Sequence, residues 1–316
     1  MARVSTGTFN LELGSVSNIS GTVGRIVEKA KSHVDENLGQ PRVLSEPLAT
    51  LPLGGRFGVQ CLDDTWPQVP LLFRARTTPL PAPWEDVFGP LRVGNIDDLV
   101  VIGQIGQSID GRVATTTGQS HYINCPAGIA HLHRLRALVD AVVIGVQTVC
   151  ADDPQLTTRR VRGPNPVRVV LDPHGRLSPN ARLLSGEVET IQVTAQDNNC
   201  KLSGVEILSL PTTDGNMAPS AILAGLAKLG LRRVLVEGGA NTVSRFLQAR
   251  CLDRLHVVIA PLILGSGRPS FAFGAIDRLE EAMRPPVRTH QLDRDMLFDC
   301  DLSAQRVPVW RAQKST

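Results

Sequence analysis

Hydrophobic residues from about residue 98 onward follow two alternating patterns. Short runs of β-branched and aliphatic residues indicate buried strands, and segments with an apolar residue every three or four positions indicate helices. The predicted strands span 99–106, 141–145, 167–172, 189–194, 204–209, 232–239 and 254–261. The predicted helices span 127–140, 217–229 and 241–249. Because apolar strands that alternate with helices are buried on both faces, the pattern predicts an α/β fold with a mostly parallel sheet flanked by helices.

Residues 1–95 lack this alternation. They hold nine of the chain's 22 prolines, and their nine basic side chains balance nine acidic ones. One helix is predicted over 22–37, with Gly39 as its stop signal. We therefore divide the chain into an N-terminal region of unknown role, 1–95, and an α/β domain, 96–316.

The composition is that of an ordinary globular protein. Of 316 residues, 42% are hydrophobic and 20% are charged, and the formal net charge is +3. This balance, without a run of Lys or Arg, argues against a nucleic-acid or membrane-surface partner. The apolar runs are shorter than the roughly 20 residues that span a bilayer, and the N-terminus has no signal pattern. We expect a cytoplasmic protein.

Cysteine and histidine give no pattern typical of a metal site. The six cysteines are scattered without a C-x-x-C pair, as expected for reduced thiols and not for a disulfide framework or a zinc site. His131 and His133 are two positions apart on a predicted helix, so they point to different sides. Cys150 is interpreted as a small packing residue, because nothing nearby marks it as a nucleophile.

The segment 234–248 has the strongest local pattern. A strand runs into Gly238-Gly239, and a helix begins near Asn241 and Thr242. Glycines allow close approach of a ligand, and a helix N-terminus offers N–H groups to phosphate oxygens. The two glycines are equally compatible with a tight strand–helix turn. Glu237 precedes them, at the strand edge where α/β sheets bind ligands.

A second polar segment follows the strand that ends at Gly145. Treated as a loop, residues 146–159 bring Thr148, Asp152 and Arg159 to the same sheet edge. Asp153 is expected to stabilise a turn. Arg159 is expected to form a phosphate clamp with Arg136 from the preceding helix. Together, the two segments predict a pocket for two phosphate-bearing ligands.

Four stretches of the sequence resemble the reductase domain of riboflavin biosynthesis. They are SIDGRVATTTGQSHYI (108–123), 133–159, PVRVVLD (166–172) and 236–265. The resemblance covers about 96–316 and implies a dihydrofolate-reductase-like fold, here with an extra N-terminal segment. It also implies that NADPH reduces a ribosylamino-pyrimidine 5′-phosphate by hydride transfer to C1′ of the ring-opened ribose, without a metal.

The resemblance also assigns residues to roles. The expected substrate-binding residues are Ser120, Arg136, Leu156, Arg159 and Glu237. The expected NADPH-binding residues are Gly106, Tyr122, Thr148, Asp152, Gly239, Ala240, Asn241 and Thr242. Asp152 and Glu237 are expected to transfer or orient a proton. With these roles, the second polar segment lies between the two ligands, with Thr148 and Asp152 at the cofactor and Arg159 at the substrate phosphate.

The sequence departs from the family pattern at several positions. Gln104 stands where many bacterial members carry Lys, Tyr122 replaces a usual Trp, and Pro173 stands where some members have Ser. Bifunctional members carry a zinc deaminase with H-x-E and P-C-x-x-C motifs. Residues 1–95 contain one histidine, His33, and one cysteine, Cys61, so this deaminase chemistry is absent there.

Two alternatives stay open on the sequence. One is a reductase of the same fold that acts on a pteridine, dihydrofolate or a pathway-specific pyrimidine. The other is a non-catalytic nucleotide-binding relative with an N-terminal interaction module. The family resemblance implies a homodimer, for which the apolar stretches 137–145 and 260–267 are the candidate contact surfaces. Asp110, after the first strand, is either a turn residue or a ligand contact.

Overall fold

The computed structural model describes residues 64–75, 77–94, 96–121, 123–198 and 202–309. The predicted helix at 22–37 and the predicted cofactor contact Tyr122 lie outside the described residues. All elements below belong to one unit of the chain, 48–316.

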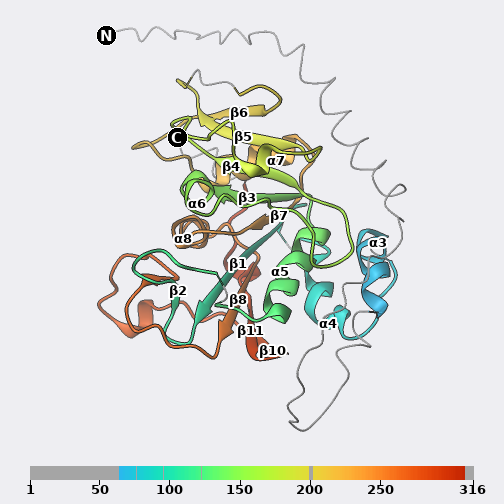
Figure 1. The fold of residues 1–316 in the computed structure, drawn as a ribbon. Coiled ribbons are helices and arrows are strands. Elements are labelled where there is room, and N and C mark those ends of the chain that lie inside the picture. The colour runs from blue at the N-terminus through green and yellow to red at the C-terminus, as the bar shows by residue number, and fades with distance from the viewer. Residues whose placement is uncertain (1–63, 76, 95, 122, 199–201, 310–316) are drawn as a thin grey trace, which may run out of the picture. The chain divides into compact units, whose positions relative to one another are not determined.

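A nine-stranded sheet forms the centre of this unit, in the order β10-β11-β8-β1-β7-β3-β4-β5-β6 (Figure 1). The strands are β1 (Val100–Ser108), β3 (Ala141–Gly145), β4 (Val167–Leu171), β5 (Thr190–Ala195), β6 (Glu206–Leu210), β7 (Arg233–Val236), β8 (Arg254–Ala260), β10 (Val287–Leu292) and β11 (Asp295–Asp301). All pairings from β8 to β6 are parallel. β11 pairs antiparallel with β8, and β10 pairs antiparallel with β11. The predicted mostly parallel sheet is therefore confirmed.

Helices cover both faces of the sheet. The longer helices are α5 (Pro126–Leu138), α7 (Pro219–Lys228) and α8 (Ala240–Gln248). Alternation along the strands sends side chains into two separate cores, because successive residues point to opposite faces. Val142 of β3 packs into the core beneath α5, and its neighbour Val143 packs into the core beneath α7 and α8.

Two features of the chain differ from the sequence prediction. Val146–Asp152, treated as a loop, forms the short helix α6, which buries Val146 and Val149 one turn apart. Seven residues give too few apolar repeats for a periodicity to be recognised. The hairpin β10–β11 was also not predicted, because β10 is an edge strand with mostly exposed side chains and no apolar alternation. A small second sheet pairs β2 (Arg112–Ala114) with β9 (Arg268–Pro269).

Residues before 95 contribute to the core beneath α5. The short helices α3 (Val69–Ala75) and α4 (Trp84–Phe88), with the 3-10 turns Trp66–Gln68 and Gly89–Leu91, lie beside α5 (Figure 1). Trp66 packs edge-on against Trp84 at 5.3 Å between ring centroids, and Phe88 stacks on His131 of α5 at 5.6 Å. This core therefore takes in side chains from both sides of residue 95, and the domain boundary there stays a prediction.

The apolar stretches proposed as dimer surfaces differ in exposure. Residues 137–145 are buried apart from partial exposure at Asp140 and Gly145, so their apolar side chains belong to the core. In 260–267, by contrast, Ile263 is 72% exposed and Leu262 is 37% exposed. Only the second stretch therefore presents apolar side chains at the surface.

Candidate active site

The carboxyl ends of β3 and β7 bring the two polar segments together. The strands are parallel and in register, with Val143 opposite Val236. The N–H of Glu237 donates to the Val143 carbonyl at 3.0 Å, so Glu237 extends the ladder by one residue. Both segments leave the sheet at this edge, as the sequence predicts for a ligand-binding crevice.

Close packing holds the Gly238-Gly239 turn on α6. Gly238 has φ +95°, and a Cβ there would lie 2.9 Å from Ile144 Cγ1. The N–H of Gly239 donates to Thr148 Oγ1 at 3.0 Å, and a Cβ on Gly239 would lie 2.8 Å from the same oxygen. Packing alone accounts for both glycines, so the tight-turn interpretation holds whether or not a ligand binds.

The N-terminus of α8 is suited to an anion. Its first turn contains no acidic residue. Within the described residues, the N–H groups of Ala240 and Asn241 donate to no protein acceptor. A nine-residue helix that begins directly after a glycine turn presents these N–H groups and the positive end of its dipole at the sheet edge. Thr242 is buried one position further on, with its Oγ1 against Gly145.

Arg136 and Glu237 form a buried ion pair. Arg136 donates from Nη2 to Glu237 Oε1 at 2.7 Å and from Nε to Oε2 at 3.0 Å. A third bond runs from Arg136 Nη1 to the Thr157 carbonyl at 3.1 Å. The two residues are only 6% and 3% exposed. This two-pronged pair fixes Glu237 and engages the guanidinium that was predicted to clamp a phosphate.

Arg159 lies at the rim of the site, and its backbone is held by a hydrogen bond to His133. The Arg159 N–H donates to His133 Nδ1 at 3.1 Å, and Arg159 Nη1 lies 3.5 Å from Thr157 Oγ1. Burial, together with the positive charges of Arg136, Arg159 and Arg160, lowers the pKa of His133 to about 3. His133 is therefore a neutral acceptor at physiological pH. The predicted contact Leu156 is 1% exposed and adopts φ +56° between α6 and Arg159.

The two aspartates at the end of α6 differ in environment. Asp153 caps the helix with φ 40°, and its Oδ1 accepts the Arg182 N–H at 2.8 Å. Asp153 thus ends the helix, and its carboxylate bonds to a distant segment and not within the local turn that the sequence predicts. Asp152, the last residue of α6, is exposed.

The remaining predicted contacts lie along and beyond β1. Gly106 packs against Asn124, whose Oδ1 would be 1.9 Å from a Cβ at this position. Asn124 Nδ2 in turn donates to the Val258 carbonyl of β8 at 3.2 Å. Gln104 is buried, and Ser120 is half-buried.

Residues 100–296 match the family model of the RibD C-terminal domain. This chain belongs to that family. The family predicted from the sequence is therefore confirmed.

Two relatives illustrate how the RibD C-terminal domain occurs. The riboflavin biosynthesis protein RibD of Aquifex aeolicus is 36% identical over 184 residues, which are 56% of this chain and 50% of the relative. The chain thus spans half the length of that protein. The 2,5-diamino-6-ribosylamino-4(3H)-pyrimidinone 5′-phosphate reductase of Methanothermobacter thermautotrophicus is 31% identical over 212 residues, which are 63% of this chain and 96% of that protein.

A solved structure shares the fold of the RibD C-terminal domain described here. It is the diaminohydroxyphosphoribosylaminopyrimidine deaminase/5-amino-6-(5-phosphoribosylamino)uracil reductase of Thermotoga maritima. The match has a TM-score of 0.57 and 28% identity, and it covers 64% of this chain and 56% of that one. The predicted dihydrofolate-reductase-like α/β fold is confirmed, with residues before the matched family region as an addition to it.

A polar network that the sequence analysis missed is buried between α5 and the strands β8 and β11. His131 Nε2 lies 3.0 Å from His256 Nδ1, and His256 Nε2 lies 3.2 Å from Asp299 Oδ1. Asp299 also accepts from Arg254 Nε at 3.0 Å. The histidine and arginine in the apolar strand β8 were the available signal. Among the residues that the structure describes, no cluster of three potential metal ligands occurs.

Asp110 stabilises a turn beyond β1. It accepts hydrogen bonds from the Ser108 hydroxyl at 2.6 Å and from the N–H groups of Leu264 and Gly265 at 3.1 and 2.7 Å. These bonds, that of Ser108 above all, lower the pKa of Asp110 to about 2. Of the two roles left open for Asp110, the structure shows the turn.

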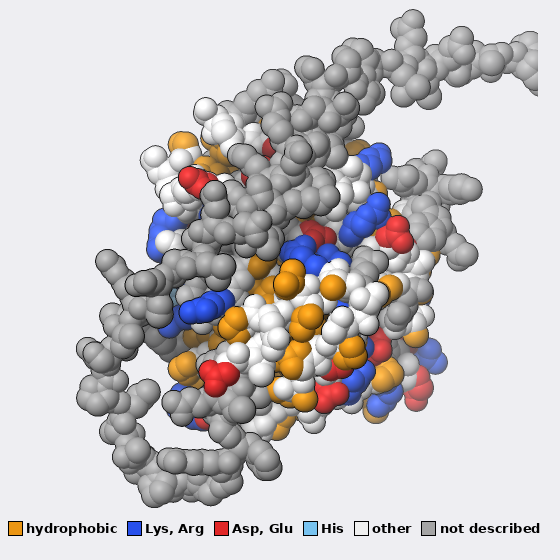
Figure 2. Space-filling model, turned by 90° about the vertical axis from the view of Figure 1, so that its right-hand side faces the viewer, with side chains coloured by type: hydrophobic (Ala, Val, Ile, Leu, Met, Phe, Trp, Pro, Cys, Tyr) orange, Lys and Arg blue, Asp and Glu red, His pale blue; other side chains and the backbone are white. Residues whose placement is uncertain are grey.

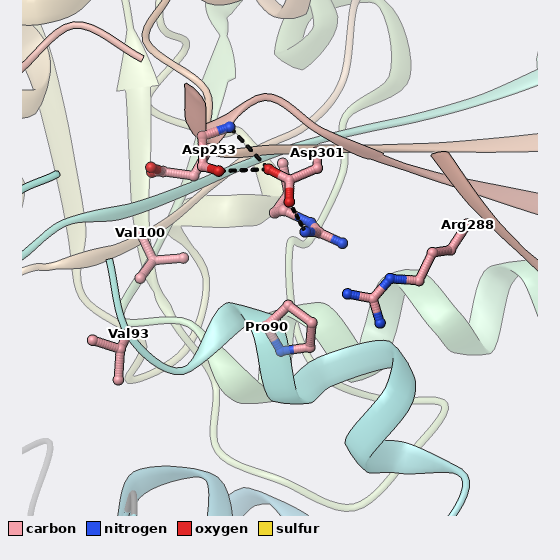
Figure 3. A pocket seen from close by; sticks show the side chains of 8 residues that line it. Pro90, Val93, Val100, Asp253, Arg288 and Asp301 are labelled. Carbon is pink, nitrogen blue, oxygen red and sulfur yellow. Dashed lines mark hydrogen bonds and ion pairs between the residues drawn. The ribbon is translucent and has the colours of Figure 1, made fainter. Parts of the chain in front are cut away.

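A cavity of about 210 Å³ lies at the opposite ends of the strands (Figure 3). Its lining includes Val100 and Arg254, the first residues of β1 and β8. Figure 3 shows Asp301 joined to its partners and Arg288 extending toward Pro90. None of the predicted site residues lines this cavity, so it is separate from the candidate active site.

Charges are mixed on the face shown in Figure 2. Basic and acidic side chains lie near each other among apolar and neutral atoms, and the visible described surface carries no broad basic field. Among the described residues, no helix has the length and apolarity that crossing a membrane requires.

Proposed function

We propose that this chain is an NADPH-dependent reductase of riboflavin biosynthesis. It reduces the ribosylamino group of a pyrimidine 5′-phosphate to the ribitylamino form, with hydride addition at C1′ of the ring-opened ribose. The observation that carries this proposal is the match to the Methanothermobacter thermautotrophicus reductase over 96% of that protein's length. A relative that is matched over nearly its whole length supports a reductase role for this chain.

The turn and helix after β7 fit the cofactor. We propose that Gly106, Tyr122, Thr148, Asp152 and 239–242 hold NADPH, with the α8 N-terminus at its phosphates. The N–H groups of Ala240 and Asn241 support this placement, because they donate to no acceptor within the described residues. NADPH supplies the hydride when bound. The surrounding residues orient it and exclude water.

The carboxylates at the site are suited to different tasks. Both oxygens of Glu237 accept bonds from Arg136, so we assign Glu237 an orienting role toward the substrate. Asp152 is exposed and its carboxylate has no hydrogen-bond partner among the described residues, which favours it as the group that exchanges a proton with the substrate or solvent. Ser120, Leu156 and Arg159 are proposed to surround the substrate, with Arg159 at its phosphate.

A turnover assay tests the proposed function. NADPH oxidation is followed with the ribosylamino-pyrimidine phosphate, with dihydrofolate and with buffer alone. Oxidation with the first compound only, and a ribitylamino product by mass spectrometry, is the expected result. Oxidation with dihydrofolate would favour the pteridine alternative. Thermal stabilisation by NADPH without turnover of either compound would favour a non-catalytic relative.

The homodimer and the cytoplasmic location are further parts of the proposal. The exposed Leu262 and Ile263 are the apolar side chains of the predicted contact stretch that reach the surface. Light scattering on the purified chain should give twice the monomer mass of 34.1 kDa. Replacement of Ile263 by Asp should shift this mass toward the monomer if the stretch forms the contact.

A further inference from the structure

Three arginines at the rim of the site have no acidic partner among the residues that the structure describes. Arg159, Arg160 and Arg182 are exposed. Within the described residues, no carboxylate lies within ion-pair distance of their guanidinium groups, whereas Arg136 forms an ion pair with Glu237. Arg159 Nη1 lies 3.5 Å from Thr157 Oγ1, a neutral hydroxyl. Three cationic groups therefore stay available to an anion.

Two backbone anchors bring these arginines to the same place. His133 Nδ1 accepts the Arg159 N–H at 3.1 Å, which fixes the segment after α6 against α5. Asp153 Oδ1 accepts the Arg182 N–H at 2.8 Å, which fixes the 3-10 turn Arg182–Leu184 against the end of α6. The cluster is thus assembled from the segments that follow two adjacent strands, β3 and β4.

The charges within the cluster repel one another. Burial lowers the pKa of the Arg159 guanidinium, and the neighbouring charges of Arg136, Arg160 and Arg182 lower it further. Like charges held together by the fold raise its free energy unless an anion lies among them. The net charge of the whole chain is only +3, so the positive charge of this cluster is a local excess.

We propose that Arg159, Arg160 and Arg182 form one binding site for a phosphate monoester dianion, with His133 as the residue that positions it. Arg160 and Arg182 are phosphate contacts that the family resemblance does not assign. Arg136 is already paired with Glu237 and is not counted in this cluster. The phosphate is either the 5′-phosphate of the sugar substrate or the 2′-phosphate of the cofactor. Only this choice of molecule rests on the proposed function.

Calorimetric titration of the full chain tests the cluster without turnover. The probes are ribose 5-phosphate, NADPH and NADH, and the variants are Arg160→Gln and Arg182→Gln. Arg284→Gln, an exposed arginine outside the cluster, is the matched control. Each cluster variant should bind the phosphate monoester about tenfold more weakly or worse, because each loses a charge-assisted hydrogen bond. Added salt should weaken wild-type binding in the same direction.

The pattern of losses identifies the source of the phosphate. Weaker ribose 5-phosphate binding with unchanged NADPH binding assigns the cluster to the substrate. Weaker NADPH binding with unchanged NADH binding assigns it to the cofactor. The proposal is overturned if wild type binds neither phosphate monoester, or if both cluster variants bind them as Arg284→Gln does. Because binding alone is measured, an absence of pyrimidine turnover would refute the proposed function and leave the cluster standing.

Discussion

The Arg136–Glu237 pair joins α5 to the carboxyl edge of β7 in the middle of the candidate site. Buried ion pairs of this kind cost much of their attraction in lost hydration, so the pair is weak evidence for stability. Removal of only one member of the pair has a different effect, because the other member stays charged and buried without a partner.

Replacement of Glu237 by Gln should therefore destabilise the chain. We expect a loss of about 3 kcal/mol in the free energy of unfolding, because Arg136 stays charged and loses its partner. Urea unfolding measures this change. The double variant Arg136→Met with Glu237→Leu should recover most of the stability and none of the activity. An equal loss in both variants would argue that packing, and not the unpaired charge, is responsible.

His133 should affect ligand affinity, and its neighbour on α5 should not. His133→Gln removes a ring-nitrogen acceptor for the Arg159 N–H, so ribose 5-phosphate should bind about three- to tenfold more weakly. NADH affinity should stay the same. His131→Gln, two residues away in the buried network with His256, should lower stability and leave both affinities unchanged. A loss of affinity in His131→Gln of similar size would refute the positioning role.

The depressed pKa of His133 also predicts a pH dependence of stability. The unfolded chain binds a proton on this histidine near its ordinary pKa of 6.5, whereas the folded chain does so only near 3. The unfolded state therefore binds more protons in this window, and the free energy of unfolding falls as the pH drops from about 6.5 toward 3. The His133→Gln variant should lack this contribution of His133 to the pH dependence of stability. Urea midpoints of both proteins between pH 7 and 4 measure the difference, and parallel curves would contradict the assignment.

At the scale of elements, the turn between β7 and α8 packs closely against two neighbouring elements, β3 and α6. Gly238 meets Ile144 of β3, and Gly239 meets Thr148 of α6, so this turn sets how closely α6 and α8 approach. The cofactor part of the proposed function depends on that spacing, because it places the N–H groups of α8.

Gly238→Ala should disturb the turn by both strain and collision. The positive φ of +95° alone costs about 1–3 kcal/mol for a residue with a Cβ. The contact of 2.9 Å with Ile144 adds to this cost. Gly186→Ala is the matched control, because Gly186 has φ +84° with no atom within 4 Å of its Cβ position. The stability difference between the two variants measures the collision, and NADPH affinity should fall in Gly238→Ala alone. Equal stability losses would mean that Ile144 moves aside.

At the scale of the molecule, one aromatic cluster ties the segment before β1 to the sheet. Trp66, Trp84 and Phe88 belong to the same core as Leu135 and Ile144. The segment therefore contributes to the stability of the domain, and Trp66 Nε1 also donates to the carbonyl of Arg162, in the stretch that follows Arg159 and Arg160, at 2.7 Å.

Phe88→Ala tests this contribution. Phe88 is fully buried against Trp84 and His131, so we expect a loss of about 3–5 kcal/mol in the free energy of unfolding. Leu71→Ala, in the same segment but 66% exposed, should change stability by no more than about 0.5 kcal/mol. NADPH affinity of the folded Phe88→Ala protein should equal that of wild type. A small stability loss would show that the segment adds little to this core.

The sequence by itself determined the elements with a clear local period and the sheet edge at which the two polar segments meet. Strands such as β3 and helices such as α5 follow from apolar residues that are neighbours in the chain, and the two polar segments follow directly after their strands. Short or exposed elements such as α6 and β10 carry too little of this signal.

Tertiary structure alone decided which polar groups pair. Arg136 and Glu237 are 101 residues apart, and His131 and His256 are 125 residues apart. No local sequence pattern distinguishes an arginine that pairs with a carboxylate of the protein from one whose guanidinium stays available to a phosphate. That distinction arises because strand order brings distant side chains within a few ångströms, where charge and burial select the partner.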